Sequence, residues 1–251
     1  MQKGIKFRIY PNREQKNFIH QTLGCCRLIY NRGLAMRKES YEEGKKIGYT
    51  QTSAMLTELK RQEEFAFLKA ADSIALQQSL RDLDRSFVNF FQKRASYPTF
   101  KSKHNRFQSY RTVNQKDNIR IVGRYIKLPK LGFVKIRQSM EVGKINHVTI
   151  EYTPAGKYFA VLNIDFEPEP RPNAGGTIGI DVGIKAFYSD SNGNTVSNPR
   201  YLERSMRKLI REQRRLSRKQ KDSHNRGKQR LRVARAVSYT HLRAHETRRH
   251  L

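Results

Sequence analysis

Positive charge is the feature that most limits what this sequence can fold into. The chain of 251 residues carries 51 Lys and Arg against 22 Asp and Glu, which gives a formal net charge of +29. A compact body with that charge repels itself, so we expect a polyanion to neutralise it. A membrane-binding protein would gather its charge on one amphipathic helix, whereas here Lys and Arg run through the whole chain, interleaved with 12 Tyr and 13 Phe. This interleaving suits phosphate contacts combined with base stacking, and it therefore predicts a nucleic-acid partner.

The composition excludes several other classes of protein. Hydrophobic residues make up 37% of the chain, and a chain of this size can build a core without disulfides. The two cysteines, Cys25 and Cys26, are neighbours and cannot easily close a normal disulfide, so we expect them to pack in the core of a protein that is not secreted. The sequence has no apolar run of about 18 residues, so no transmembrane helix is predicted, and the N-terminus lacks the apolar segment of a signal peptide.

Hydrophobic periodicity divides the first 170 residues into strands and helices. Residues 4–10 alternate apolar and polar side chains, as a half-buried strand does. Asn12 and Gln15 have the spacing of a capping pair that starts a helix, and Gly24 marks a possible break between two helices. Helices are also predicted over 52–60 and 73–93, so residues 12–95 form a small helical unit. The later strand candidates are 120–122, 125–128, 133–137, 147–150 and 158–162.

Short strands at this spacing indicate a small barrel or sandwich. The first strand could pair with that sheet, which would leave the helical unit as an insertion. The Pro-rich segment 166–173 predicts a domain boundary. After it, the apolar run 176–183 and the turn signal at 191–194 indicate the opening hairpin of a new α/β domain.

Residues 200–236 are predicted to be helical and very basic, with 15 Lys and Arg against 3 Asp and Glu. Such an excess of one sign destabilises a free helix, so we expect the helix to lie along a polyanion. The alternative is a solvated helix face, which is the usual role of a charge run.

Asp181 is the candidate catalytic residue and metal ligand. It lies in an apolar run between Gly179 and Gly183, which permit the close approach of a ligand or another backbone. Burying a carboxylate on a sheet is costly unless it is paired or binds a metal, and a nuclease of the RNase H-like type needs such a group to hold Mg²⁺. The alternative is an Asp at a strand end that forms a turn or pairs with Lys185.

One carboxylate cannot build a two-metal site. The other acidic residues of this part of the chain are expected to be solvated partners of Lys and Arg, with Asp190 also preceding a turn. They are Asp190, Glu203, Glu212, Asp222 and Glu246.

The stretch from 97 to 107 alternates rings and cations, as a nucleic-acid surface would. The alternative is a loop whose Phe residues fill the core while its Lys residues face water. The predicted nucleic-acid-binding residues of the whole chain are Tyr97, Phe100, Lys101, Lys103, Arg106, Lys130, Arg200, Arg204, Arg207, Arg211, Arg214, Arg215 and Arg218.

Seven short motifs follow one another in a specific order and spacing. They are KFRIYP (6–11), GCCRLIYN (24–31), LRDLD (80–84), YPTFKS (97–102), LPKLG (128–132), GIDVG (179–183) and NPRYL (198–202). Together they resemble the TnpB/OrfB family of insertion-sequence transposases over residues 1 to about 236.

The resemblance implies an α+β multi-domain fold. Residues 1–11 and 96–170 would form an oligonucleotide-binding-like β-barrel, 12–95 an inserted helical lobe of the helix-turn-helix kind, and 175–236 the first part of an RNase H-like (RuvC) α/β domain. Family members use a transposon-derived guide RNA to cut double-stranded DNA with Mg²⁺, and they are similar to type V CRISPR effectors. Asp181 matches the first acidic residue of the family's catalytic triad. The resemblance implies a prokaryotic cytoplasmic, nucleoid-associated protein without a membrane partner.

The sequence departs from the family pattern near its end. The family's second carboxylate, its four-Cys Zn²⁺ module and its last Asp are expected beyond residue 251, and residues 237–251 are interpreted as an aberrant tail. We therefore expect a truncated fragment that binds nucleic acid and lacks nuclease activity. The alternative is a helix-turn-helix DNA-binding regulator of transposition.

Overall fold

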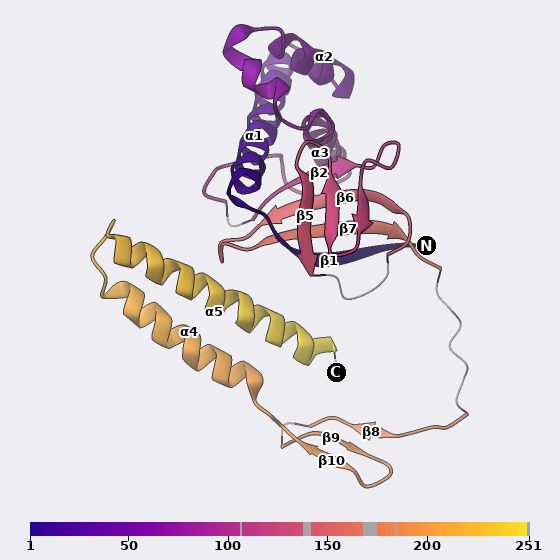
Figure 1. Ribbon diagram of the computed structural model, residues 1–251, viewed down its shortest axis with the longest axis vertical. Helices are drawn as coiled ribbons and strands as arrows, with labels where there is room; N and C mark the ends of the chain where they lie inside the picture. Colours follow the sequence, from indigo (N-terminus) through magenta and orange to yellow (C-terminus); the bar gives the residue numbers. More distant parts are fainter. Residues whose placement is uncertain (106, 138–141, 168–174, 184, 250–251) are drawn as a thin grey trace. The chain divides into compact units, whose positions relative to one another are not determined.

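The computed structural model of the protein describes residues 1–105, 107–137, 142–167, 175–183 and 185–249 (Figure 1). The chain divides into two compact units, which are described separately. The first comprises Met1–Thr153 and Lys157–Glu167, and the second comprises Pro154–Gly156 and Pro168–Leu251.

The first unit joins a seven-stranded antiparallel sheet to a helical lobe. Its elements are β1 (Gln2–Tyr10), α1 (Arg13–Glu42), α2 (Tyr49–Leu59), the 3-10 helix η1 (Glu63–Lys69), α3 (Ser73–Phe91), β2 (Gln108–Val113), β3 (Arg120–Val122), β4 (Tyr125–Leu128), β5 (Gly132–Arg137), β6 (Ile145–Tyr152) and β7 (Tyr158–Asp165). The strand order is β2-β6-β7-β1-β5-β4-β3. Strand β1 thus lies inside the sheet, paired with strands that follow the helical lobe in sequence, as predicted.

The sheet curls around one core, on which the helices also pack (Figure 1). Phe7 and Ile9 point inward from β1 and are 2% and 1% exposed, because alternate residues of a strand face opposite sides. Cys25 and Cys26 are buried free thiols in the same core, which confirms the packing role predicted for them. All five of the later predicted strands are confirmed, whereas β2 was not predicted.

Helix α1 is a single helix of 30 residues. The predicted capping pair is confirmed, because the Asn12 Oδ1 accepts a hydrogen bond from the Gln15 amide at 2.8 Å while the Asn12 amide donates to the Gln15 Oε1 at 3.0 Å. The predicted break at Gly24 is wrong. Leu23 and Cys25 on either side of Gly24 are buried in the core, and this packing offsets the cost of about 1 kcal/mol that an interior glycine imposes on a helix.

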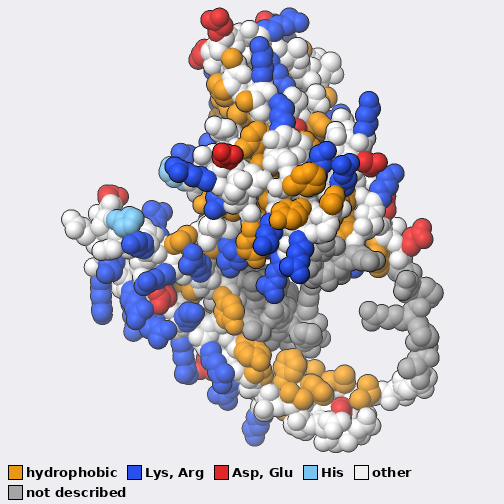
Figure 2. All heavy atoms as spheres, viewed as in Figure 1, with side chains coloured by type: hydrophobic (Ala, Val, Ile, Leu, Met, Phe, Trp, Pro, Cys, Tyr) orange, Lys and Arg blue, Asp and Glu red, His pale blue; other side chains and the backbone are white. Residues whose placement is uncertain are grey.

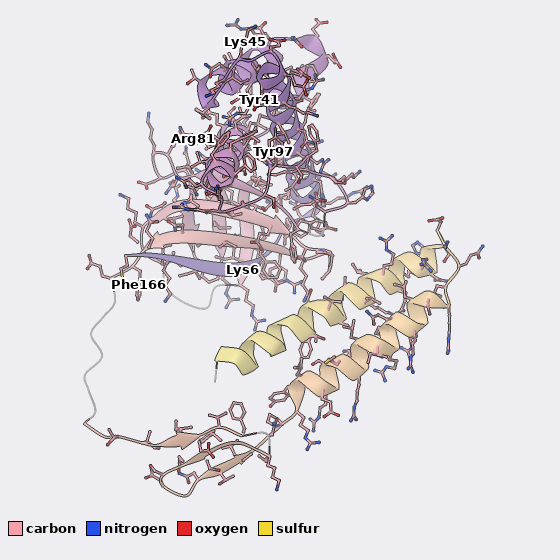
Figure 3. All side chains as sticks on the ribbon, turned by 180° about the vertical axis from the view of Figure 1, so that it is seen from behind. Lys6, Tyr41, Lys45, Arg81, Tyr97 and Phe166 are labelled. Atoms are coloured by element: carbon pink, nitrogen blue, oxygen red, sulfur yellow. The ribbon has the colours of Figure 1, made fainter. Side chains whose placement is uncertain are left out.

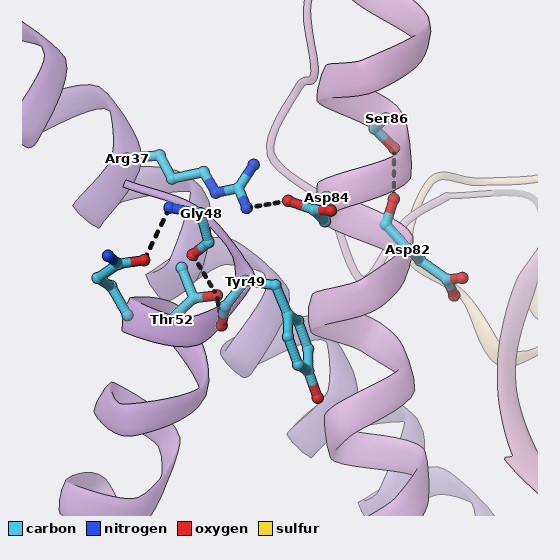
Figure 4. Close-up of polar contacts among 8 residues, drawn as sticks. Arg37, Gly48, Tyr49, Thr52, Asp82, Asp84 and Ser86 are labelled. Carbon is cyan, nitrogen blue, oxygen red and sulfur yellow. Dashed lines mark hydrogen bonds and ion pairs between the residues drawn. The ribbon is translucent and has the colours of Figure 1, made fainter. Parts of the chain in front are cut away.

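Helices α1 and α3 cross closely at Gly33, where a Cβ would lie 2.9 Å from the Leu80 Cδ2 atom. One turn further along α1, the guanidinium of Arg37 forms an ion pair with Asp84 of α3 (Figure 4) and lies 4.8 Å from the centroid of the Phe87 ring. The Arg37 residue is 8% exposed, so this cation holds the two helices together rather than facing solvent.

The second unit contains a small sheet and a helical hairpin. Its elements are β8 (Ile180–Asp181), β9 (Ala186–Asp190), β10 (Thr195–Ser197), α4 (Tyr201–Ser217) and α5 (His224–Arg249). The predicted turn at 191–194 is confirmed, since it joins the paired strands β9 and β10.

The helical character expected of residues 200–236 is confirmed, but it is divided between two helices, because α4 ends at Ser217 and α5 begins at His224. Asp222 has a left-handed φ of 62°, and the Ser223 Oγ accepts from the Arg226 amide at 3.1 Å as the cap of α5. The Arg226 guanidinium in turn donates to the carbonyls of Leu216 and Lys219 at 3.2 and 2.7 Å, which satisfies the last turn of α4. Across the described residues, no helix combines the length and apolar character needed to span a bilayer.

Candidate nucleic-acid interface

An arginine row runs along α4. Arg207, Arg211, Arg214 and Arg218 follow one another at spacings of four, three and four residues, which places them on one side of the helix. With Ile210 and Arg215 they line an open groove of about 450 Å³. Many Lys and Arg side chains are visible on α4 and on the described part of α5 (Figure 2). The predicted phosphate contacts of this helix are thus gathered into one surface, which we call the α4 arginine row.

The opposite side of α4 contains a buried carboxylate. Glu212 is 7% exposed, and its Oε2 accepts a hydrogen bond of 2.7 Å from the Gln229 amide of α5. That hydrogen bond, with smaller contributions from Arg215 and Arg211, lowers the pKa of Glu212. Glu212 is an ion-pair partner, as expected, since its Oε1 lies 3.1 Å from the Arg215 guanidinium. It is not solvated, however, because it lies between two helices. Glu203 does match that expectation, since it pairs with Arg207 at the surface.

Two further predicted contacts flank the start of α4. Arg200 has a left-handed φ of 46° and its amide donates to the Asn198 side chain at 2.9 Å. Arg204 is exposed in the first turn of the helix. Both side chains therefore lie near the end of the α4 arginine row.

The residues of the basic-aromatic stretch 97–107 differ in their surroundings. Some pack within the protein, and others are exposed as a nucleic-acid surface would be. Tyr97 packs edge-on against the rings of Phe87 and Phe90, with centroids 5.7 and 5.3 Å apart. Phe100 is 58% exposed and Lys103 is exposed, as a nucleic-acid contact requires. Arg106 lies outside the described residues.

Lys101 is held against the helical lobe. Its amide donates to the Asn31 Oδ1 at 2.8 Å, and its carbonyl accepts from the Asn31 Nδ2 at 3.0 Å. The ammonium lies 3.9 Å from the centroid of the Tyr30 ring, and desolvation lowers its pKa. This geometry favours a structural role for Lys101.

Lys130 is also engaged within the protein. Its ammonium donates to the carbonyls of Lys69 at 2.6 Å, Ala70 at 3.4 Å and Ala71 at 2.9 Å. Lys130 thus joins the β4–β5 turn to the end of η1, and an ammonium has only three donors. A phosphate contact at Lys130 stays a prediction that would require these bonds to break.

Asp181 lies on an edge strand and is exposed. The expected burial is wrong, because β8 is two residues long and, among the residues that the structure describes, pairs with β9 alone. Its neighbours Ile180 and Val182 are 59% and 38% exposed, so no layer of the described chain covers this strand. Asp181 and Lys185 form no ion pair among the described residues.

Asp190 does not complete a metal site with Asp181. It pairs across the sheet with Ile180, which places the two carboxylates on opposite faces. Its oxygens accept hydrogen bonds of 2.9 Å from Asn192 and Asn194, and the bonds from Asn194 lower its pKa. Its predicted place before a turn is confirmed. Among the described residues, no three His, Cys, Asp or Glu side chains converge to hold a metal ion.

Residues 1–46 match the family model described as "Helix-turn-helix domain" of the OrfB IS605 type, and residues 147–251 match the OrfB IS605 model described as "Probable transposase". The chain belongs to the TnpB/OrfB family. It is 36% identical over 239 residues to a "Putative RNA-guided DNA endonuclease" of Streptomyces pristinaespiralis, and 34% identical over 242 residues to the "Putative RNA-guided DNA endonuclease InsQ" of Escherichia coli K12. Each alignment covers 94% of this TnpB/OrfB chain and 59% of the relative, so the chain spans about three fifths of their length.

Two further proteins resemble the chain over a shorter stretch or at a lower identity. "Virulence protein VsdF" of Salmonella dublin is 32% identical over 114 residues, which cover 41% of this TnpB/OrfB chain and 96% of that protein. A CRISPR-Cas12f chain from a ternary complex aligns with 92% of this chain and 58% of its own length at 14% identity and a TM-score of 0.35. That score is too low to support a conclusion.

Proposed function

We propose that this TnpB/OrfB chain binds RNA and DNA as part of an RNA-guided DNA endonuclease encoded by an insertion sequence, acting on DNA in the prokaryotic nucleoid. The α4 arginine row carries the proposal. Arg211, Arg214, Arg215 and Arg218 crowd one helix, and such a concentration of cations is stabilised by the phosphates of a polynucleotide. The names of the two relatives that align with most of the chain support the assignment to RNA-guided cleavage.

In this proposal, the curled sheet corresponds to an oligonucleotide-binding-like barrel, with α1 to α3 as its inserted lobe. The unit that contains Asp181 corresponds to the start of a RuvC-like domain. Asp181 would supply one oxygen ligand for Mg²⁺, a metal that binds through few carboxylates. The described residues alone do not fit a metal site, since no three His, Cys, Asp or Glu side chains converge among them.

The phosphate contacts are tested by the salt dependence of binding. If the chain contacts six to ten phosphates, its affinity should fall roughly 10³- to 10⁵-fold between 50 and 200 mM salt. The double variant Arg214→Gln with Arg218→Gln should reduce the slope of log affinity against log salt by about 2. A flat salt response of the unmodified protein would disprove the phosphate contacts.

A matched control removes the same charge from the helical lobe. Lys45→Gln with Arg61→Gln changes two cations whose side chains are 72% and 73% exposed and which pair with Glu43 and Glu58. Because these cations already have carboxylate partners, the slope should stay unchanged. Equal effects of the two double variants would show that net charge, rather than the α4 arginine row, sets the binding.

The role of Asp181 is tested in a cleavage-competent form of the protein. Asp181→Ala should abolish Mg²⁺-dependent cleavage and leave binding unchanged, because Asp181 lies on a different element from the α4 arginine row. The control Glu203→Ala removes an exposed carboxylate of the same unit and should leave cleavage intact. Cleavage that survives Asp181→Ala would disprove the proposed role.

A helix-turn-helix DNA reader is the second candidate, since the family model that matches residues 1–46 carries that description. In the structure these residues form β1 and the single helix α1, whereas a helix-turn-helix needs two helices joined by a tight turn. Competition between structured transposon-end RNA and duplex DNA separates the candidates. An RNA-guided protein should prefer the RNA, and a duplex reader should prefer the DNA.

A further inference from the structure

The outward face of β1, β5, β4 and β3 carries a row of side chains that is separate from both the α4 arginine row and Asp181. The strand register places Tyr10 opposite Lys135, Lys135 opposite Tyr125, and Tyr125 opposite Val122. Directly opposed residues of an antiparallel pair point to the same face. Across the four strands the row therefore consists of a ring, a cation, a second ring and an aliphatic side chain. We call these four residues the β1–β3 row.

The aromatic rings of this face are open to solvent. Tyr10, Tyr125 and Phe133 are 45%, 47% and 51% exposed, although each projects from a strand whose other face is in the core. Apolar side chains with Lys and Arg beside them are visible over β3, β4 and β5 (Figure 2). Three exposed rings on one rigid sheet are costly in water unless a ligand covers them.

The charges of the face are of one sign. Besides Lys6, which pairs with Glu151 of β6, its outward cations are five: Arg8, Arg120, Lys127, Lys135 and Arg137. The outward positions of these four strands hold no Asp or Glu, and none of the five cations forms an ion pair within the described chain. The Arg8 guanidinium lies 5.2 Å from the centroid of the Tyr10 ring, so it covers one of the rings with positive charge. A polyanion with flat apolar groups complements this surface.

The spacing of the row suits unpaired nucleotides. Neighbouring strands lie about 4.8 Å apart, so Tyr10 and Tyr125 are separated by about 10 Å, with the ammonium of Lys135 between them. Bases stack on such rings while cations contact the phosphates, irrespective of base sequence. A duplex cannot use the rings, because each of its bases is already covered by its neighbours.

We propose that the β1–β3 row binds an unpaired DNA strand, with bases stacked on Tyr10 and Tyr125 and a phosphate at Lys135. The choice of DNA rests on the proposed function. When a guide RNA pairs with one strand of a duplex, the other DNA strand is displaced and must be held in single-stranded form. That strand has its bases free along its whole length.

The test compares four ligands of one sequence with the full chain. They are a DNA strand of about 12 nucleotides, within the range that small barrels bind, the matching RNA strand, and the DNA and RNA duplexes. Tyr125→Ala and Tyr10→Ala should each weaken binding of the DNA strand roughly 5- to 150-fold and leave both duplexes within about twofold. Lys135→Gln should reduce the salt slope for the DNA strand by about 1.

Tyr41→Ala is the matched control. Tyr41 is 74% exposed and lies in the helical lobe, away from the sheet (Figure 3), so its removal should leave all four affinities unchanged. Urea unfolding midpoints equal to that of the unmodified protein establish that the variants fold.

The outcomes separate this proposal from the function on which it rests. If the unmodified protein binds none of the four ligands, the proposed function fails. If it binds them and Tyr125→Ala changes nothing, or weakens duplexes as much as single strands, only the β1–β3 row is disproved. A loss confined to the RNA strand would overturn the assignment to DNA.

Discussion

The two interior glycines of α1 have different surroundings, so replacing each by alanine should have opposite effects. At Gly33 a Cβ would lie 2.9 Å from the Cδ2 of Leu80 and 3.0 Å from the Cδ2 of Leu83. Both leucines are fully buried, at 0% exposure, so an added Cβ forces their side chains to shift within the packed core. At Gly24 the nearest atom to a Cβ is the Arg27 Nη2 at 3.9 Å, which leaves room for the methyl group.

The expected magnitudes follow from two terms. Alanine in place of glycine favours a helix by about 0.5–1 kcal/mol at both positions. At Gly33 the inserted carbon overpacks the α1–α3 crossing, which costs about 1–3 kcal/mol. Gly24→Ala should therefore raise the free energy of unfolding by about 0.5–1 kcal/mol, and Gly33→Ala should lower it by about 1 kcal/mol.

Urea unfolding of the full chain, followed by far-ultraviolet circular dichroism, measures both changes. Because the two variants introduce the same group into the same helix, each is the control for the other. The midpoint should rise for Gly24→Ala and fall for Gly33→Ala. If Gly33→Ala proved as stable as Gly24→Ala, the close crossing of α1 and α3 would be refuted.

Three further predictions concern single side chains. Lys130→Met should lower the free energy of unfolding by about 1–2 kcal/mol in urea titrations, because it removes the donor to the end of η1. Nucleic-acid affinity should stay the same. Unchanged stability with weaker nucleic-acid binding would instead indicate a phosphate contact. Burial, assisted by Lys103, lowers the pKa of His20 below 6.5, so the folded chain favours the neutral ring. The stability that the neutral His20 ring contributes should be fully present above about pH 6.5 and be lost as the pH drops through the folded pKa. The urea midpoint of His20→Gln should therefore fall less on acidification than that of the unmodified protein. Gln229→Ala removes the donor to the Oε2 atom of the buried Glu212 and leaves only the Arg215 contact to its Oε1, so it should lower the thermal midpoint of the α4–α5 hairpin. Gln213→Ala, at an exposed position of the same hairpin, should not.

The sequence predicted the elements whose signals are local. The alternation in residues 4–10 identified β1, and the Asn12–Gln15 spacing identified the start of α1, because side-chain period and capping chemistry act within a few residues. Strand β2 was missed, because only Tyr110 and Thr112 of its six residues face the core and neither is strongly apolar. The cap at Ser223 was available in the sequence and would have placed the boundary between α4 and α5.

The environment of single charged side chains could not be predicted in the same way. Lys101 and Lys130 are basic residues in motifs typical of nucleic-acid contact, but their partners come from residues about 60 to 70 positions earlier in the chain. Glu212 has the sequence context of a solvated charge and is buried by Gln229 of the next helix. Asp181 has an apolar context and is exposed, because within the described part of the chain its strand has a partner on one side only. Tertiary neighbours decide these cases, and sequence spacing does not reveal them.

The place of β1 in the sheet has a consequence for how the protein is made. Gln2 pairs with Asp165 and Ile9 with Tyr158, so β1, which is synthesised before the other strands of its sheet, pairs there with the strand that is synthesised last, β7. The contacts among α1, α2 and α3 are far more local and can form during synthesis, whereas such distant pairings are slow to form. Until residue 165 has emerged, the edge of β1 that pairs with β7 is free for other chains to bind, and chaperones that shield this strand should raise the yield of folded protein.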